Sequence, residues 1–143
     1  MVRKLFTCLL TGLMVSLVIS CDKMDENDKL DGFWQMTSWV EKETGDTVAT
    51  RYDSKIFYTI QLELLRMQDL TTPSGPMYQS YFHYTKDSLF IERTFVRPFD
   101  EEMPLDSLAQ FGSTPDGRFG IDLLTRSQMV LSNSMNILSF RKY

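Results

Sequence analysis

The chain contains little cysteine and little histidine, which limits the chemistry it can perform. Its two cysteines, Cys8 and Cys21, both lie in the first 21 of its 143 residues, and His83 is the single histidine. Residues 22–143 can therefore form no disulfide, no thiolate metal site and no thiol nucleophile. One histidine also cannot build a conventional zinc site without help from carboxylates. We expect no metal and no cofactor.

Familiar catalytic motifs are missing as well. The sequence has no G-x-S-x-G, H-E-x-x-H, P-loop or C-x-x-C pattern. The acidic residues Asp100, Glu101 and Glu102 are adjacent, so they need not converge, and such a run is typical of a solvated loop. His83 could serve as a general base or a lone metal ligand, but alternation places it opposite an aromatic stripe, which favours a solvated position. We expect a protein that is not an enzyme.

The chain has no excess of basic residues. Fifteen Lys and Arg against nineteen Asp and Glu give a net charge of −4. Two of the basic residues and none of the acidic ones lie in residues 1–20, so residues 21–143 carry a charge of −6. An acidic body repels the phosphates of nucleic acids and the anionic lipids of membranes. We expect no nucleic-acid partner and no electrostatic attachment to a membrane.

The N-terminal apolar stretch is too short to span a membrane but is typical of an export signal. Two basic residues precede fifteen largely apolar residues, 5–19, whereas a spanning helix needs about 20. Residues 18–21, with the sequence VISC, then resemble the bacterial lipobox. The resemblance implies that residues 1–20 are removed as a lipoprotein signal peptide and that Cys21 is acylated, for example with palmitate. An ordinary cysteine behind a conventional signal peptide is the alternative.

This anchor implies a location. We expect a lipid-anchored protein of the cell envelope, at the outer membrane, on either its surface or its periplasmic face. Residues 21–29 are polar, acidic and without periodicity, which is typical of a tether. Acidic residues close behind a lipidated cysteine resemble a surface-export signal of Bacteroidota lipoproteins, and a solvated linker explains the same charges.

From residue 30 onward, apolar and polar residues alternate with a period of two, which indicates β-strands. The predicted strands cover residues 34–40, 47–52, 56–64, 78–84, 89–96, 119–124, 128–132 and 135–141. Residues 104–111 instead place apolar side chains three and four apart, which suits one or two helical turns or an irregular flap. Short strands separated by turn residues predict an all-β domain, either an antiparallel sandwich or a barrel.

Two stretches resemble the lipocalin-like domains of small bacterial lipoproteins, which belong with the calycin barrels. Leu30-Asp31-Gly32-Phe33-Trp34 is similar to the G-x-W opening of the first strand, and residues 119–125, 129–131 and 137–142 are similar to the closing strands. The resemblance implies that residues 30–143 form an antiparallel lipocalin-like β-barrel of about eight strands. It also implies that Trp34 plugs one end and that Arg141, a basic residue after the last strand, caps this tryptophan.

A barrel of this size has an interior that side chains fill or that one small ligand occupies. We expect non-catalytic binding of a small apolar or amphipathic ligand there. The candidate ligand-binding residues are Trp34, Tyr58, Phe82, Tyr84, Arg93 and Phe95. Arg93 alternates along a predicted strand with Leu89, Ile91 and Phe95. On an inward face its guanidinium would bind an acidic group of the ligand. A position near the strand end, with its head in water, is the alternative.

A filled barrel would lead to a different function. The protein would then act through its surface, as a subunit of an envelope complex or as an inhibitor of an attacking enzyme. Residues 97–118, Phe33 and Trp39 are the candidate contacts in that case. The two hypotheses differ in one structural feature, which is whether the barrel interior holds a cavity open to solvent.

Overall fold

The computed structural model describes residues 27–143, so Cys21, the predicted signal peptide and most of the predicted tether lie outside the described residues. Eight of the described strands form the wall of a barrel: β1 (Gly32–Glu41), β3 (Ile56–Gln61), β4 (Leu64–Asp69), β5 (Met77–Tyr84), β6 (Ser88–Arg97), β8 (Arg118–Leu124), β9 (Gln128–Ser132) and β10 (Asn136–Lys142). The remaining elements are η1 (Asp28–Leu30), β2 (Thr47–Thr50), β7 (Glu101–Met103) and η2 (Leu105–Phe111). None of the described helices has the length and apolar character needed to cross a membrane.

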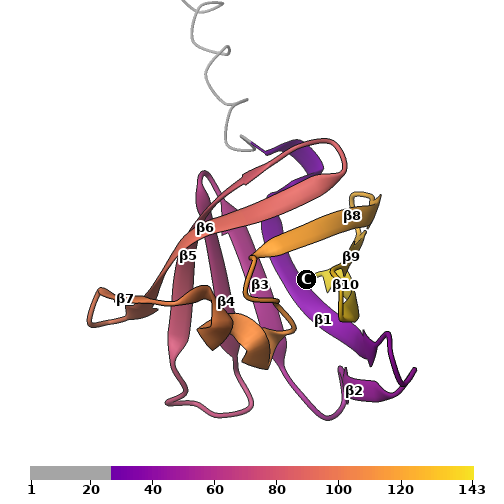
Figure 1. Cartoon of the computed structure of the whole chain (residues 1–143), viewed down its shortest axis with the longest axis horizontal. Coiled ribbons are helices and arrows are strands. Elements are labelled where there is room, and N and C mark those ends of the chain that lie inside the picture. Colours follow the sequence, from indigo (N-terminus) through magenta and orange to yellow (C-terminus); the bar gives the residue numbers. More distant parts are fainter. Residues whose placement is uncertain (1–26) are drawn as a thin grey trace, which may run out of the picture.

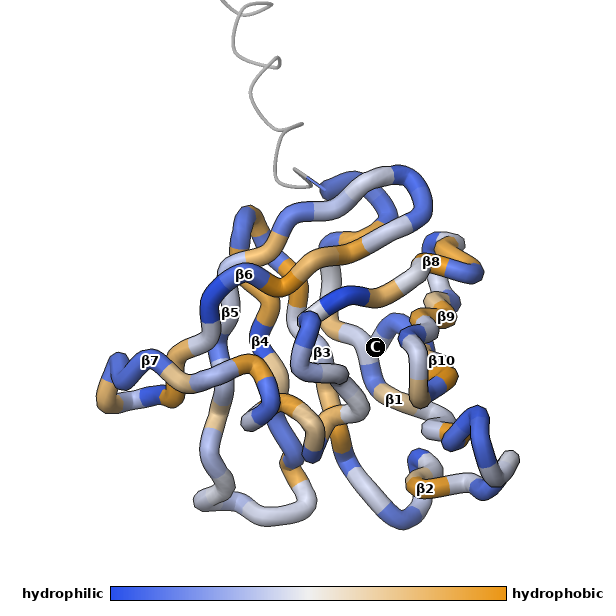
Figure 2. The backbone as a smooth tube through the Cα atoms, in the orientation of Figure 1, coloured by the Kyte–Doolittle hydropathy of each residue, from blue (hydrophilic) through white to orange (hydrophobic). Residues whose placement is uncertain are grey.

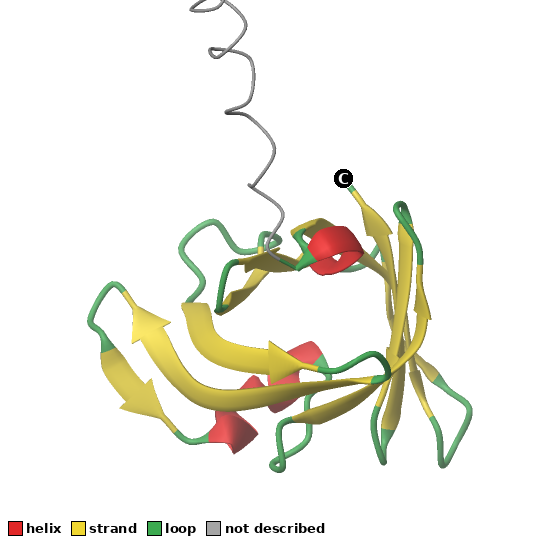
Figure 3. Ribbon diagram, turned by 90° about the horizontal axis from the view of Figure 1, so that it is seen from above, coloured by secondary structure: helices red, strands yellow, loops and turns green. Residues whose placement is uncertain are grey.

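The eight wall strands form a closed antiparallel ring (Figures 1 and 3). Each strand pairs with the next in the order β1-β3-β4-β5-β6-β8-β9-β10, and β10 returns to pair with β1. Outside this ring, β2 pairs with β1 and β7 pairs with β6. The predicted all-β, antiparallel barrel of about eight strands is confirmed.

The predicted strand over residues 56–64 is a hairpin instead. β3 ends at Gln61, and Leu62 takes a positive φ of 56°, which turns the chain into β4. This conformation is unusual for a bulky residue such as leucine. The prediction of one continuous strand was wrong because Leu62 and Leu64 continue the alternation of β3 through the turn. Alternation alone therefore contains no signal for this break.

A β-bulge in β6 changes which side chains face the interior. Tyr81 of β5 pairs with Arg93, whereas the next residue, Phe82, pairs with Ile91, so Glu92 is an extra residue in β6. One extra residue reverses the alternation of everything beyond it. Ile91 is accordingly buried, and Arg93, two residues later, is exposed. The prediction that Arg93 shares a face with Ile91 was therefore wrong.

The inward-facing side chains form one contiguous buried cluster to which every wall strand contributes. Its largest fully buried aromatic members are Trp34, Tyr58, Phe111 and Phe119. Figure 2 shows hydrophobic and hydrophilic residues alternating along the strands, with hydrophilic residues frequent in the connections. No cysteine lies among residues 27–143, so the fold relies on this burial, worth about 25 cal/mol per Å² of apolar surface.

The barrel has two ends, which we name by what lies there. The tether end is the end at which Asn27 lies. It consists of residues 27–32, 61–64, 84–88, 121–128 and 141–143. In Figure 1 this end lies at the top, at the connection between β5 and β6. The opposite end contains η2, and we call it the η2 end. It consists of residues 41–55, 69–76, 97–117 and 133–136.

Candidate functional site

Three of the six predicted ligand-binding residues lie inside the barrel. Trp34 and Tyr58 face each other across β1 and β3, and both are fully buried. Phe82 of β5 points into the same interior and is 6% exposed. The structure thus brings these aromatic side chains into one core. Other side chains of the protein fill the space between them, as in the contact of the Tyr58 and Phe140 rings, whose centroids lie 4.7 Å apart.

The other three predicted residues, Tyr84, Arg93 and Phe95, lie outside this core. Tyr84 is 37% exposed at the tether end. Arg93 lies on the outer surface, where its Nε and Nη2 donate to the two carboxylate oxygens of Glu102 at 3.1 and 2.8 Å. Phe95 lies on the same outer surface and packs edge-on against Tyr81. Arg93 therefore has a carboxylate partner within the chain and does not face the interior.

The pair of Arg93 and Glu102 is a solvated ion pair. Hydrogen bonding to Glu102, and the charge of that carboxylate, raise the pKa of Arg93. The hydrogen bond from Arg93 in turn lowers the pKa of Glu102. Exposed pairs of this kind contribute little to stability. The guanidinium of Arg93 thus lies in water, as in the alternative to an inward position, although Arg93 lies within β6 and not near its end.

The η2 end is closed by two side chains that do not come from the barrel strands. Leu108 and Phe111 of η2 are 0% and 2% exposed and belong to the buried cluster. The η2 helix lies in the connection between β7 and β8 (Figure 1). The Phe111 ring packs edge-on against Tyr78, with centroids 5.6 Å apart. Of the two expectations for residues 104–111, helical turns or an irregular flap, the structure has helical turns, in η2. We call Leu108 and Phe111 the η2 plug.

A buried hydrogen bond ties this plug to the wall. The Tyr58 hydroxyl donates to the carbonyl oxygen of Phe111 at 2.7 Å. Burial raises the pKa of Tyr58 above its ordinary value, so the hydroxyl stays protonated and remains a donor. Breaking the bond without a replacement would leave buried polar groups unpaired, at a cost of about 1–3 kcal/mol. A molecule that takes the place of the plug therefore needs an acceptor for this hydroxyl.

The turn that follows η2 is held at a single glycine. Gly112 has a φ of 88°, and its carbonyl oxygen accepts hydrogen bonds from Nδ2 of Asn133 at 2.7 Å and of Asn136 at 3.0 Å. A Cβ at this position would lie 2.7 Å from Cδ2 of Leu138. Glycine is required here because it alone combines the left-handed conformation with this close approach. The C-terminal side of the plug is thus fixed to the barrel.

One polar pair lies within the apolar interior. The hydroxyl oxygens of Ser80 and Thr94 are 2.8 Å apart across β5 and β6, and both residues are fully buried. Each satisfies the other, as buried polar groups require. Sequence reasoning missed this pair because only the bulge at Glu92 turns Thr94 inward. Together with the Tyr58 hydroxyl, this pair places polar groups among the apolar side chains of the interior.

The tether end is closed by Trp34 and a lysine. The Nζ atom of Lys142 lies 4.7 Å from the centroid of the Trp34 ring. The same ammonium donates to the carbonyl oxygens of Lys29 at 3.1 Å and Asp31 at 2.6 Å. The indole N–H of Trp34 donates to the carbonyl oxygen of Leu30 at 2.8 Å. These contacts tie η1, the first strand and the last strand together.

Arg141, which the resemblance had suggested as the cap of Trp34, points elsewhere. Its Nε and Nη2 donate to Oε1 of Gln35 at 2.9 and 2.7 Å. Adjacent residues of a strand point to opposite faces, and the pairing of β1 with β10 places Lys142 directly opposite Trp34. The cap is therefore Lys142, and the expectation for Arg141 was wrong by one residue.

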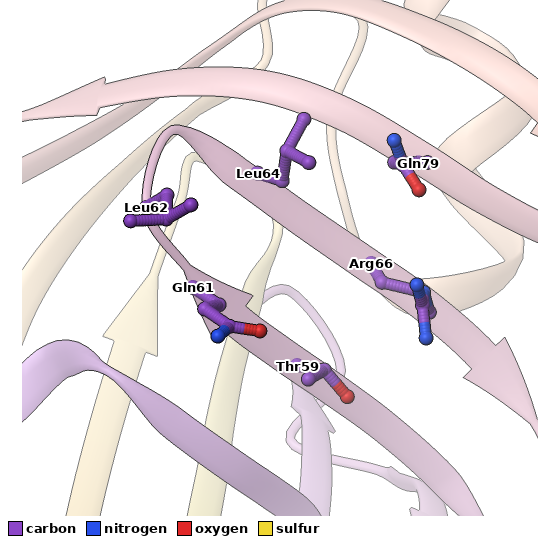
Figure 4. Close-up of a pocket in the computed structure, with 6 residues that line it drawn as sticks. All are labelled: Thr59, Gln61, Leu62, Leu64, Arg66 and Gln79. Carbon is purple, nitrogen blue, oxygen red and sulfur yellow. The ribbon is translucent and has the colours of Figure 1, made fainter. Parts of the chain in front are cut away.

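We consider two of the open depressions on the surface of residues 27–143. The smaller, of about 160 Å³, lies on the outer face of β3, β4 and β5 (Figure 4) and is lined by Thr59, Gln61, Leu62, Leu64, Arg66 and Gln79. The larger, of about 420 Å³, lies at the tether end and is lined by Asn27, Asp28, Lys29, Tyr84, Thr85, Lys86, Ile121, Asp122, Leu123 and Leu124. Neither depression is lined by the η2 plug.

His83 lies on the outer surface, in agreement with the solvated position favoured above. Its Nδ1 lies 2.6 Å from Oε1 of Glu92, and its ring stacks on Phe90 with centroids 4.7 Å apart. Among residues 27–143, no three His, Cys, Asp or Glu side chains are grouped so that they could hold a metal ion.

A family model described as a lipocalin-like domain matches residues 13–143. The chain belongs to this lipocalin-like family. Among solved structures, the lipocalin-like domain is similar to a lipocalin-like protein from Bacteroides uniformis ATCC 8492, with a TM-score of 0.59 and 19% identity over 80% of this chain and 99% of the other. It is also similar to an uncharacterized protein from Bacteroides eggerthii DSM 20697, with a TM-score of 0.57 and 21% identity over 79% and 98%.

A protein from Burkholderia xenovorans, solved by NMR, has a TM-score of 0.53 against the lipocalin-like domain and 14% identity over 79% of this chain and 82% of the other. No curated protein matches the sequence. At these identities the likeness to solved structures shows the fold alone. The fold hosts many functions, so the function has to be argued from the site.

Proposed function

We propose that this lipocalin-like protein is a non-catalytic, lipid-anchored envelope protein that binds a small apolar or amphipathic ligand inside its barrel, in place of the η2 plug. One observation carries the proposal: the core at the η2 end is completed by Leu108 and Phe111, which belong to a connection and not to a wall strand. Wall strands are held by the ladder of the closed ring, whereas η2 is held by hydrogen bonds to the carbonyl oxygens of Phe111 and Gly112, which can break while the ring stays paired.

The walls around the plug suggest the chemistry of the ligand. Tyr78 packs against the Phe111 ring and would pack equally against an apolar group in its place. The Tyr58 hydroxyl donates to the Phe111 carbonyl and would donate to an oxygen acceptor of the ligand. A ligand with an apolar body and one carbonyl or carboxylate oxygen therefore fits the site that the plug fills. Arg93 has no part in this proposal.

The intact mass of the protein tests the proposal. We would purify the protein with Cys21 replaced, from a bacterial host of its own type, and compare its mass under native and denaturing conditions. An excess of a few hundred daltons that disappears on denaturation is the expected result. The absence of any excess, together with no binding of a long-chain fatty acid used as a probe, would contradict it.

Two tyrosine variants make this test specific. Tyr58→Phe removes the buried donor, and we expect it to weaken binding of the fatty acid about tenfold. Tyr52→Phe is the matched control, because Tyr52 is 81% exposed and does not belong to the buried cluster. Equal binding by the two variants would show that the Tyr58 hydroxyl does not take part.

A second candidate function is favoured by the filled interior. A solid barrel would act through its surface, and Phe99, 80% exposed in the connection between β6 and β7, is its most prominent contact residue within 97–118. Phe33 is 37% exposed and stacks on Phe57 with centroids 4.5 Å apart. Trp39 is less available than expected, because it is partly buried and its indole N–H donates to Asn136. This candidate predicts no bound small molecule and a partner that Phe99→Ser releases.

The anchor is tested in the cell. We expect metabolic labelling with an alkyne-bearing fatty acid to modify the protein and to place it in the membrane fraction. Cys21→Ser should abolish the label, whereas Cys8→Ser, the matched control, should retain it. Label that persists in Cys21→Ser would contradict the proposed attachment site.

A further inference from the structure

The lining of the larger surface depression combines apolar side chains with charges of both signs. Its apolar lining consists of Tyr84, Ile121, Leu123 and Leu124. Tyr84 and Leu123 are 37% and 41% exposed, although both are large hydrophobic side chains. The charged lining consists of Lys29, Lys86, Asp28 and Asp122. Such a combination suits a molecule with an apolar body and a head that carries both a negative and a positive charge.

The short segment between Cys21 and Asn27 limits how far this depression can lie from a bilayer that holds Cys21. Asn27, one of its lining residues, is six residues after Cys21. Six residues span at most about 20 Å even when fully extended. An acylated Cys21 would therefore hold the tether end within about 20 Å of a bilayer surface. The η2 end lies at the opposite end of the barrel, beyond the length of the strands.

The distribution of charge also favours an orientation with the tether end next to the bilayer. The η2 end carries ten acidic side chains and four basic ones, whereas the tether end carries five of each. The acidic residues of the η2 end are Glu41, Glu43, Asp46, Asp53, Asp69, Asp100, Glu101, Glu102, Asp106 and Asp116, and the basic ones are Lys42, Arg51, Lys55 and Arg97. A membrane surface with negative potential repels the η2 end and leaves the balanced tether end free to approach.

We infer that the tether end of the barrel docks on the bilayer and that the depression beside Asn27 takes up a zwitterionic phospholipid of that surface. This inference rests on the anchor proposed above and concerns a site separate from the η2 plug. Lys29 and Lys86 face the phosphate of the lipid, Asp28 and Asp122 face its ammonium group, and Leu123 contacts the upper part of its acyl chains. The η2 end then points away from the membrane, open to ligands from the aqueous side.

Photolabelling from a defined bilayer tests the docking. Without residues 1–20 the chain keeps one cysteine, Cys21, and still contains the whole ring of strands. Cys21 is coupled to a maleimide-bearing lipid in vesicles of phosphatidylethanolamine and phosphatidylglycerol that carry a trace of phosphatidylethanolamine with a diazirine near its headgroup. After illumination, labelled peptides are identified by mass spectrometry. We expect label in residues 84–88 and 121–125 and little in residues 97–104.

Two matched variants sharpen the result. Leu123→Glu places a charge in the depression, and we expect it to reduce the label about tenfold. Ile137→Glu is the control, because Ile137 is 37% exposed on the outer face of β10 and does not line the depression, and it should label as the unmodified chain does. Label spread evenly over both ends, or unchanged in Leu123→Glu, would overturn the inference.

Chemical coupling keeps this result separate from the proposed function. The coupled protein is anchored whether or not the cell acylates Cys21, so an even distribution of label overturns the docking and leaves the anchor and the ligand site standing. Conversely, a native protein without acyl groups overturns the anchor and, with it, the docking in the cell, whatever the fatty-acid binding of the barrel.

Discussion

The two ends of the barrel bury similar aromatic side chains but are closed by different means. At the tether end, Trp34 belongs to β1 and its cap Lys142 belongs to β10, and these strands pair directly. At the η2 end, Leu108 and Phe111 belong to a connection. A side chain of the wall cannot leave the core without breaking the ladder, whereas a side chain of a connection can. The two ends are therefore equally buried but held by different means, and the η2 end is the one at which we propose that a ligand binds.

The largest expected effect is at the tether end. We expect Trp34→Ala to lower the free energy of unfolding by about 3–5 kcal/mol, because it leaves a large cavity and removes the ring beneath Lys142. Urea unfolding followed by circular dichroism measures the change. Trp39→Ala, at a partly buried tryptophan, is the comparison and should cost less. If Trp34→Ala lowered the free energy of unfolding by less than about 1 kcal/mol, the claim that the tether end is closed more firmly than the η2 end would be contradicted.

Phe111→Ala probes the η2 plug. We expect it to lower the free energy of unfolding by about 2–4 kcal/mol, less than a wall residue of similar size, because the connection can settle into the vacated space. Hydrogen exchange should accelerate mainly in residues 105–117, whereas Trp34→Ala should accelerate exchange around the ring. Phe99→Ala, at an exposed position, should change stability by no more than about 0.5 kcal/mol. If Phe111→Ala accelerated hydrogen exchange equally in all strands, the plug would unfold together with the wall and not by itself.

Lys142→Met separates the cap from the tryptophan that it covers. The substitution keeps the apolar stem over Trp34 but removes the ammonium that donates to two carbonyl oxygens. We expect a loss of about 1–2 kcal/mol in urea unfolding. Arg126→Met, at an exposed residue of the same end, is the control and should have no measurable effect. Equal losses in the two variants would show that the hydrogen bonds of Lys142 contribute nothing specific.

The smallest expected effect is a pH dependence at the η2 end. Hydrogen bonds from the Thr114 hydroxyl and the Arg118 backbone N–H lower the pKa of Asp116, with partial burial opposing them. A group whose pKa is lowered on folding adds stability above its unfolded pKa, and this stability is lost as the pH falls through the folded pKa. The protection of the amides near residues 112–117, measured against their intrinsic exchange rates at each pH, should therefore fall below about pH 4.

The matching variant is Asp116→Asn, which should reduce this acid sensitivity at the η2 end without changing exchange at the tether end. Asp106→Asn, at an exposed acid in η2, is the control. Identical acid profiles for the unmodified protein and Asp116→Asn would show that this carboxylate does not hold the turn.

Most of the inward-facing side chains of the wall could be predicted from the sequence, because the alternation of apolar and polar residues is visible within each strand by itself. Trp34, Tyr58 and Phe82 were expected to line the interior, and all three lie there. The same rule failed at Arg93 and Phe95, because the extra residue Glu92 is recognised only from the pairing with β5. A bulge is a property of two strands together, so a single strand's pattern does not contain it.

The candidate site was less predictable than the wall. Residues 104–111 were expected to be helical or irregular, but nothing in their spacing assigned Phe111 to the barrel core or its carbonyl to Tyr58. The cap of Trp34 was expected one residue too early, at Arg141. Both errors concern contacts between residues far apart in the chain, which depend on how the ring closes.

The sequence by itself determined the fold class and the side of the barrel on which most strand residues lie. It could do so because a period of two is a local property of the backbone. The tertiary structure alone decided that Arg93 pairs with Glu102 outside, that Lys142 covers Trp34 and that the η2 plug completes the core. These contacts follow from strand register and ring closure, and both are set by the free energy of the whole assembly of strands.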